Sequence, residues 1–331
     1  MSLRAKITGV GHYVPSKVLN NKELEKMVDT SDDWIVSRTG IKERRILEDG
    51  KASSFMGALA ARVALENAGV SAEELDLIVV ATVTPDMFFP STACLIQHEI
   101  GAKNAWGVDV NGACTGFLYA TAMGAQFIES GRYQKVLIVG SDKMSSITDY
   151  TDRNTCVLFG DAAAAIVLEP TTEEAHVGIL DYILKSDGSG QNFLYMKGGG
   201  SLHPASHETV DNKMHYIYQD GRTVFKFAVT GMADVTEQIA KKNNIQSDDI
   251  KLFIPHQANL RIIDAAAQRV KLPPEKVLIN IDKYGNTTAA TIPLGLSEAY
   301  NEGRIKQGDY IIFAAFGAGF TWGSMLVRWA Y

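Results

Sequence analysis

Asp76-Leu77-Ile78-Val79-Val80 is an apolar run that matches a later one, Asp249-Ile250-Lys251-Leu252-Phe253-Ile254-Pro255. Both runs are rich in aliphatic and β-branched residues, which is typical of strands buried on both faces of a sheet. Each is followed by a helical stretch, a short strand, a helix of small residues and a further apolar run. This order of strands and helices predicts an α/β fold with a largely parallel sheet.

The spacing of landmarks in these two regions indicates an internal duplication. The opening aspartates are 173 residues apart (249 − 76), and the pairs Gly131-Arg132 and Gly303-Arg304 are 172 apart (303 − 131). The second short strand is predicted at 277–281. We therefore predict a duplicated βαβ core, with an N-terminal half at 1–171 and a C-terminal half at 172–331.

The composition of the 331-residue chain bounds its class. Hydrophobic residues make up 46%, and the net charge of −6 argues against nucleic acid binding through a broad basic face. The three cysteines are too few for a disulfide framework, and no apolar run reaches the length of about 18 residues that a membrane span needs. With no signal-peptide pattern at the start, we expect a cytoplasmic protein.

Three further segments have clear patterns. Helices are predicted at 53–68, which ends at Gly69, and at 221–242, with an irregular insertion at 186–221 between the halves. The insertion contains several metal-ligating residue types at spacings that fit no standard zinc pattern. We assign them to a surface loop and predict no metal site: His203, His207, Glu208, Asp211 and His215.

The duplication places two polar residues at corresponding positions. Adding 172 to Cys114 gives Asn286, so each is expected at a junction between a strand and a helix. Ligand sites in α/β proteins favour the carboxyl ends of strands. Both junctions could therefore face one central site.

Cys114 has the surroundings of a nucleophile. It lies in Asp109-Val110-Asn111-Gly112-Ala113-Cys114-Thr115-Gly116-Phe117, where a strand passes through small residues into a helix. A thiol at a helix N-terminus has a lowered pKa and a larger thiolate fraction, which an acyl-accepting group needs. The alternative is a buried core cysteine. For Cys94 and Cys156, core packing is the interpretation we adopt.

His256 and Asn286 complete a set of three. His256 follows the predicted strand 252–254, and Asn286 lies in Lys283-Tyr284-Gly285-Asn286-Thr287-Thr288-Ala289, where a helix N-cap is the simpler interpretation. Cysteine, histidine and asparagine together serve two chemistries. One is hydrolysis, in which the asparagine orients a histidine base. The other is decarboxylative carbon–carbon bond formation, in which both residues donate hydrogen bonds to a thioester oxygen.

Several motifs resemble β-ketoacyl-acyl carrier protein synthase III, a condensing enzyme of the thiolase superfamily. The resemblance covers nearly the whole chain, in order. It rests on the Cys114 segment and on 255–261, 284–288, 32–41, 159–161 and 316–323. The family implies a five-layer αβαβα thiolase fold, a homodimer, and condensation of an acyl-CoA primer, usually acetyl-CoA, with malonyl-acyl carrier protein to start fatty acid synthesis. No cofactor beyond the CoA thioester substrate is implied.

The resemblance implies a role for each member of the set. Cys114 takes the acetyl group from CoA, and His256 and Asn286 promote decarboxylation of the malonyl thioester. The backbone N–H groups of Cys114 and Ala318 form the oxyanion hole. Relatives often have Gly where Ala318 stands, so its methyl group could narrow the primer pocket.

Substrate contacts follow from the same resemblance. Trp34 and Arg153 sandwich the CoA adenine, Arg38 contacts a CoA phosphate, and Asn259 contacts the pantetheine arm. Phe316 lines the acyl pocket, and Phe89 crosses the dimer to line the partner's pocket. A basic surface for the acidic carrier protein would involve Lys226, Gln257, Ala258, Asn259, Leu260, Arg261 and Arg269.

Three alternatives stay open at this point. A related ketide or specialised-metabolite synthase would use another acyl-CoA. A Cys-His-Asn thioester hydrolase would release free acid, and a degenerate homologue would bind acyl groups without catalysis. The preferred primer is not predicted by the sequence.

Overall fold

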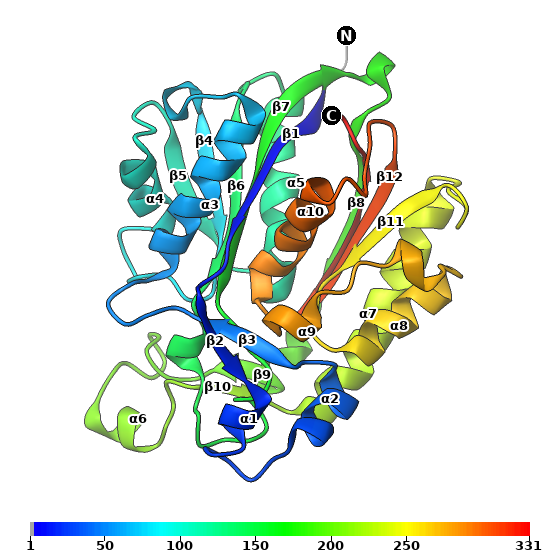
Figure 1. The fold of residues 1–331 in the computed structure, drawn as a ribbon. Helices are drawn as coiled ribbons and strands as arrows, with labels where there is room; N and C mark the ends of the chain where they lie inside the picture. Colours follow the sequence, from blue (N-terminus) through cyan, green and yellow to red (C-terminus); the bar gives the residue numbers. More distant parts are fainter. Residues whose placement is uncertain (1–2) are drawn as a thin grey trace.

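Two β-sheets form the framework of the computed structural model, which describes residues 3–331 (Figure 1). The first has the strand order β1-β7-β6-β4-β5, and the second has the order β11-β12-β13-β8. The first consists of β1 (Leu3–Tyr13), β4 (Leu77–Ala81), β5 (Trp106–Val110), β6 (Val136–Asp142) and β7 (Ala162–Thr172). The second consists of β8 (Gly178–Ser186), β11 (Ile250–Pro255), β12 (Tyr310–Gly317) and β13 (Thr321–Arg328).

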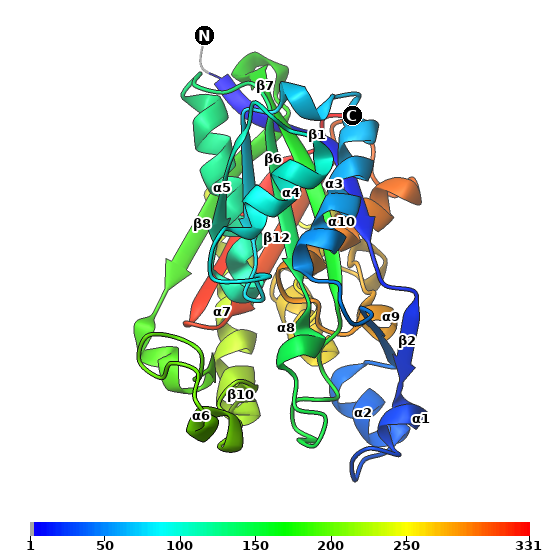
Figure 2. The same ribbon diagram turned by 90° about the vertical axis from the view of Figure 1, so that its left-hand side faces the viewer.

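Helices cover both sheets and fill the space between them (Figures 1 and 2). Outside the first sheet lie α3 (Ser53–Ala68) and α4 (Thr92–Ile100), and outside the second lie α7 (Gly221–Lys242) and α8 (Leu260–Arg269). Between the sheets lie α5 (Gly116–Glu129) and α10 (Thr291–Asn301). The five-layer αβαβα arrangement of the predicted thiolase fold is therefore confirmed.

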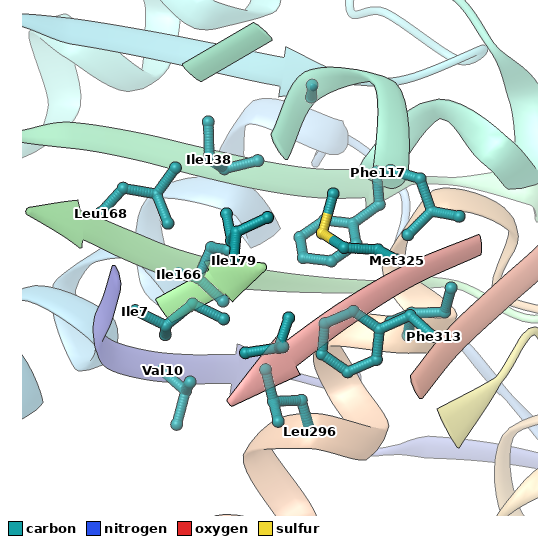
Figure 3. Close-up of a cluster of buried hydrophobic side chains, with 14 of the residues drawn as sticks. Ile7, Val10, Phe117, Ile138, Ile166, Leu168, Ile179, Leu296, Phe313 and Met325 are labelled. Atoms are coloured by element: carbon teal, nitrogen blue, oxygen red, sulfur yellow. The ribbon is translucent and has the colours of Figure 1, made fainter. Parts of the chain in front are cut away.

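Strand periodicity explains the layering, because alternate side chains point to opposite faces of a sheet. In β4, Leu77 and Val79 join the central cluster between the sheets, whereas Ile78 and Val80 pack under the outer helices. The central cluster is the largest and contains the side chains that Figure 3 labels. Both sheets are thus apolar on both faces, as their continuous apolar runs predict.

Two sequence-based expectations about the strands are wrong. The sheets are mixed, because β4 is parallel to β5 and β6, and β11 to β12, while the other pairs are antiparallel. The strand expected at 277–281 is reduced to one bridge between Val277 and Phe253, after which the chain enters α9 (Ile281–Tyr284). The Gln257 carboxamide accepts the N–H groups of Asn280 and Ile281, so these donors are not available for strand pairing.

The two predicted helices have the expected bounds. Helix α3 ends at its C-cap Gly69, whose φ of 65° is the left-handed conformation that favours glycine. In α7, the Asp220 side chain accepts the Thr223 N–H at the N-terminus, and lysines lie in the last turn. The division of the chain at 171/172 stays a prediction.

Smaller elements gather at one end of the molecule (Figure 1). They are β2 (Lys17–Asn20), α1 (Asn21–Leu24), α2 (Asp32–Thr39), β3 (Glu43–Ile46), β9 (Leu194–Met196), α6 (His207–Asp211) and β10 (Ile217–Gln219). The insertion at 186–221 is thus partly regular, since β9 pairs with β10. Across residues 3–331, no group of three or more metal-ligating side chains is arranged to hold an ion. No described helix combines the length and the apolar character that crossing a membrane requires.

Candidate active site

Cys114, His256 and Asn286 all line one cavity of about 920 Å³. Cys114 lies in the 3-10 turn η2 (Ala113–Thr115), between β5 and α5. His256 directly follows β11, and Asn286 lies between α9 and the 3-10 turn η7 (Thr288–Ala290) that opens α10. The structure therefore brings together three residues that the sequence places at junctions of strands, turns and helices.

The internal symmetry differs from the expected one by three residues. The turn η2 begins at Ala113 and η7 at Thr288, and both residues have positive φ values, of 45° and 51°. These turns are 175 residues apart (288 − 113), so the counterpart of Cys114 is Ala289. Asn286 lies three residues earlier, in the connection before the turn. Loops that differ in length explain why the landmarks in the sequence gave 173 and 172.

The Cys114 thiol is less acidic than the sequence suggests. Its side chain is buried, and burial together with the nearby Asp142 carboxylate raises the pKa of the thiol to about 12. The expected lowering by the helix N-terminus is therefore outweighed by desolvation, which disfavours the charged form. In the free protein Cys114 is a neutral thiol.

His256 is a neutral imidazole held from its backbone. Its N–H donates to the Ala314 carbonyl at 2.8 Å, which fixes the residue at the end of β11 beside β12. Burial lowers the pKa of the ring to about 3. Within residues 3–331, neither ring nitrogen has a hydrogen-bond partner, although both are buried. The ring is thus available to donate one N–H into the cavity.

Asn286 is fixed by three hydrogen bonds, two to the 157–160 segment and one within its own segment. Its backbone N–H donates to Leu158 O at 2.9 Å, and its carbonyl accepts the Gly160 N–H at 3.0 Å. Its side-chain Oδ1 accepts the Thr288 N–H at 2.9 Å, which leaves the NH2 group to face a ligand. The sequence-based alternative of a helix N-cap is partly right, because the side chain does bond the turn that precedes α10.

A buried arginine supports the segment that holds Asn286. The Arg44 guanidinium is fully buried and donates to the carbonyls of Leu19 and Val157 and to Asn21 Oδ1. Burial lowers its pKa to about 10. The bond to Val157 fixes the start of the 157–160 segment, whose backbone pairs with Asn286.

The loop after β12 lies against Cys114. A Cβ atom on Gly317 would lie 2.9 Å from the Cys114 nitrogen, so only glycine fits without a shift. Ala318 follows and lines the cavity. The Thr321 hydroxyl contacts the carbonyls of Ala318 at 3.0 Å and Gly112 at 3.3 Å, and this ties the two loops together.

The cavity mouth carries an indole and several basic groups. Trp34, Arg38 and Asn259 line it, whereas Arg153 does not. The Arg153 guanidinium lies 4.7 Å from the centre of the Trp34 ring. A ring between them would need about 7 Å, twice a van der Waals separation. The predicted adenine sandwich therefore requires Arg153 to move away from Trp34.

Asn259 caps helix α8 and bonds the backbone of Arg38 at the mouth of the cavity. Its Nδ2 donates to the Arg38 carbonyl at 2.9 Å, and its Oδ1 accepts the Arg261 N–H as the N-cap of α8. One amide hydrogen remains for a ligand. The cap and the pantetheine contact that the resemblance implies are thus compatible.

The acyl-pocket candidates lie in different environments. Phe316 is buried and lines the cavity, whereas Phe89 is 84% exposed and does not line it. Sequence analysis missed other apolar lining residues, including Val83, Met144 and Phe159. Val83 follows an apolar strand, Met144 lies between polar residues, and Phe159 belongs to the 159–161 motif, but nothing in these local patterns marks a cavity wall.

The expected carrier-protein surface needs one correction. Gln257 is 1% exposed, and its carboxamide bonds the carbonyls of Pro255 and Leu278 and two N–H groups, so it cannot make a surface contact. Lys226 and Arg261 are exposed, while Ala258 and Leu260 are half-buried. Arg269 is paired with Asp234 and Glu237. Arg222, which lines the cavity and is exposed, was missed.

The other two cysteines differ from one another. Cys156 is buried, as expected. Cys94 is exposed, contrary to the core-packing interpretation, because it faces away from the sheet while Ala93 and Ile96 of the same helix are buried.

A five-layer αβαβα fold with a buried thiol, a neutral imidazole and a carboxamide around one cavity defines a condensing enzyme of the thiolase type. Family models described as 3-oxoacyl-[acyl-carrier-protein (ACP)] synthase III and its C-terminal region match residues 108–188 and 240–329. A beta-ketoacyl-[acyl-carrier-protein] synthase III of Koribacter versatilis is 56% identical over 99% of this chain and 98% of its own. One from Bacteroides thetaiotaomicron is 54% identical over 99% and 97%.

A crystal structure of 3-oxoacyl-[acyl-carrier-protein] synthase III from Aquifex aeolicus superposes with a TM-score of 0.90 at 45% identity, covering 98% of this chain and 100% of that one. The chain belongs to the β-ketoacyl-acyl carrier protein synthase III family. The family resemblance seen in the sequence, and the condensing enzyme class it implied, are confirmed.

Proposed function

We propose that Cys114 accepts an acyl primer from acyl-CoA and then transfers it to a malonyl-derived carbanion. In the first step, the Cys114 sulfur forms a bond to the acyl carbon and the bond from that carbon to the CoA sulfur breaks. The proton lost by the thiol is taken up by the departing CoA thiolate, so no net base is consumed. The Cys114 and Ala318 N–H groups stabilise the oxyanion of the tetrahedral intermediate.

In the second step, His256 and Asn286 act on malonyl-acyl carrier protein. Their N–H groups donate to the thioester oxygen, where negative charge develops as the bond to CO2 breaks. The resulting enolate attacks the acyl carbon on Cys114, the bond from that carbon to the Cys114 sulfur breaks, and the departing thiolate takes up a proton from water. The observation that carries this proposal is that a neutral imidazole and a fixed carboxamide line one cavity with the thiol.

The hydrolase alternative does not fit the contacts of His256. A Cys-His-Asn hydrolase needs its asparagine to orient the imidazole. Here Asn286 Oδ1 is occupied by the Thr288 N–H, and His256 has no hydrogen bond to it. A ring whose pKa is lowered to about 3 is also a poor base.

The test is product formation from two thioesters. Acetyl-CoA and malonyl-acyl carrier protein should give acetoacetyl-acyl carrier protein and CO2, and mass spectrometry measures the acetoacetyl product. The reaction should also proceed with EDTA present, because we propose that no cofactor takes part. His256→Ala should still acquire an acetyl group on Cys114 but lose condensation. Release of free acetate without a new carbon–carbon bond would overturn the proposal, as would full condensation by His256→Ala.

We propose a short primer, with acetyl as the first candidate. The cavity that Cys114 lines also has apolar walls, which include Val83, Met144, Phe159 and Phe316. A panel of acetyl-, propionyl- and branched acyl-CoA, read as mass added to Cys114, ranks the primers. A clear preference for a longer acyl group would instead favour a ketide synthase.

The carrier protein is proposed to dock at the basic rim of the cavity. Arg222, Lys226 and Arg261 are exposed on α7 and α8, and Arg261 stacks on Phe225 at 4.8 Å. Lys226→Glu should raise KM for malonyl-acyl carrier protein and leave KM for acetyl-CoA unchanged, because Lys226 is exposed and does not line the cavity. The matched control is Lys251→Glu, which lies exposed on β11 at the end away from His256. Equal effects on both substrates would contradict this docking site.

We also propose a cytoplasmic homodimer. Phe88 and Phe89 are 81% and 84% exposed, an unusual state for two adjacent aromatic side chains. The nearby edge strand β5 has no lysine or proline to protect it, which favours pairing with a second copy. Phe89 would then reach the partner's acyl pocket. Sedimentation of the wild type and of Phe88→Ser with Phe89→Ser tests this, and a wild-type monomer would refute it.

A further inference from the structure

The internal symmetry relates a second pair of residues besides Cys114 and Ala289. Asp142 ends β6 and Gly317 ends β12, and they are also 175 residues apart (317 − 142). Gly317 lies against the backbone nitrogen of Cys114, at 2.9 Å from the position of an added Cβ. Asp142 Oδ2 accepts the N–H of Ala289 at 3.1 Å. Each strand therefore ends at the first turn before the other half's central helix.

The spaces beside the backbone N–H groups of Ala289 and Cys114 are filled differently. At Ala289, the space beside the backbone N–H is filled by a fully buried carboxylate of the protein itself. At Cys114, the glycine leaves that space to the cavity, where the proposed function puts the oxyanion of a substrate. The fold thus contains two similar positions for an anion, one of which is filled by a side-chain carboxyl group of the protein.

Asp142 is bound on every side by groups that stabilise a carboxylate. Its Oδ1 accepts from the Val83 N–H at 2.8 Å and from the Thr82 hydroxyl at 3.0 Å, with longer bonds from Thr84. These bonds hold the 82–84 segment, whose Val83 lines the cavity. The same carboxylate therefore joins a wall of the cavity to the turn at Ala289.

We propose that Asp142 is a positioning residue for decarboxylation, because its carboxylate holds the turn that orients the Asn286 carboxamide. The connection has two steps. Asp142 fixes Ala289 through its N–H, and the neighbouring Thr288 N–H fixes Asn286 Oδ1 at 2.9 Å. Thr288 has a φ of 51°, a conformation costly for a β-branched residue, so the turn needs such support. The inference rests on the proposed condensing function.

The experiment is Asp142→Asn, which keeps the shape but replaces one acceptor oxygen with an NH2 group. In either orientation this NH2 faces a backbone N–H, of Ala289 or of Val83, so the turn or the wall shifts. Misplacement of a reacting group by about 1 Å costs on the order of 100-fold in rate. We expect condensation to fall 10- to 100-fold, while acetylation of Cys114 changes less than about threefold.

A second readout does not depend on condensation. The charged group that acts on the Cys114 thiol is Asp142, and the titratable group across the cavity is the neutral His256. Loss of the carboxylate charge should move the midpoint of Cys114 alkylation by iodoacetamide to lower pH. Partial unfolding would also lower this midpoint, because burial is the main cause of the raised Cys114 pKa, so the thermal unfolding of Asp142→Asn must match that of the wild type for the shift to count.

Controls separate the possible failures. Asp76→Asn removes a carboxylate that also accepts two backbone N–H groups, from Gln134 and Lys135, at the far end of the same sheet, and should change neither step. If Asp142→Asn does not fold, Thr82→Val removes one donor to Asp142, and should slow condensation selectively by a smaller factor without moving the alkylation midpoint.

Each outcome decides one of the two proposals. A wild type that forms no acetoacetyl product refutes the proposed function, while the alkylation shift still reports on Asp142. If the wild type condenses, equal loss of both steps in Asp142→Asn, or condensation at the wild-type rate, refutes the positioning role. Selective loss with a shifted midpoint supports it.

Discussion

Replacing Gly317 with alanine should block the acylation of Cys114 more than it disturbs the fold. The added Cβ would lie 2.9 Å from the Cys114 nitrogen, 3.1 Å from its Cβ and 3.3 Å from its Cα. Ordinary contacts between such atoms are about 3.5 Å or longer, so the loop or the turn must move by roughly 0.5 Å. The methyl group also enters the space proposed for the oxyanion.

The expected size of the effect follows from the loss of oxyanion stabilisation. Removing one such donor typically costs about 100- to 1,000-fold in rate, or about 2.7–4 kcal/mol. Gly317→Ala should therefore slow the transfer of acetyl from acetyl-CoA to Cys114 by this factor. Intact-protein mass spectrometry over time measures the transfer directly, and thermal unfolding by circular dichroism checks the fold.

Two variants serve as controls for this measurement. A Cβ at Gly188 would meet nothing within 4 Å, so Gly188→Ala should acylate at the wild-type rate. Ala318→Gly keeps its backbone N–H and should also acylate within a few-fold of wild type. Acylation of Gly317→Ala within about threefold of wild type, with an unchanged fold, would refute the assignment of the oxyanion site.

Three further predictions address the mouth, the core and the pH response. Trp34→Ala should raise KM for acetyl-CoA several-fold with KM for malonyl-acyl carrier protein unchanged, and initial-rate kinetics would contradict the CoA contact if both rose together. Arg44→Met leaves three acceptors without donors and should lower the free energy of unfolding by about 3 kcal/mol in urea titrations, whereas the half-buried Arg45→Met should cost about 1 kcal/mol or less. His256 has a folded pKa of about 3, below its usual 6.5, so the unfolded chain binds a proton that the folded protein does not. Relative to His256→Asn, the wild type should therefore lose about 1.4 kcal/mol of its free energy of unfolding per pH unit on acidification from pH 6.5 toward pH 3. Parallel pH dependences of the two proteins would instead show that His256 is protonated in the folded state.

The sequence was informative where local chemistry and position in an element coincide. His256 comes directly after a run that forms a strand and Cys114 four residues after one, so the internal repeat and the family resemblance could place both at one site. The helices at 53–68 and 221–242 could be predicted to the residue. The apolar spacing of the first ends at Gly69, and the second has apolar spacing with Lys241 and Lys242 in its last turn.

Other features depend on contacts that no local pattern contains. The pKa of Cys114 is raised because tertiary packing removes water and brings Asp142 close, and these effects exceed that of the helix N-terminus. The sequence places Gln257 beside His256 as a surface residue. Its carboxamide instead accepts the backbone N–H groups of Asn280 and Ile281, in the region where a strand was expected at 277–281. Asp142 shows only a weak signal, a carboxylate at the end of an apolar strand, and its partner in the other half appears only in three dimensions.

The middle layer makes the two halves thermodynamically inseparable. Helices α5 and α10 pack between the sheets in one apolar cluster. Unfolding either sheet with its helix would therefore expose the apolar face of the remaining helix to water. We therefore expect local opening of this middle layer to cost nearly as much free energy as global unfolding. Cys114 and Asn286 lie in the segments that lead into α5 and α10 and are therefore anchored on this layer, whereas Trp34 and Arg38 lie on the small helix α2 at the mouth of the cavity.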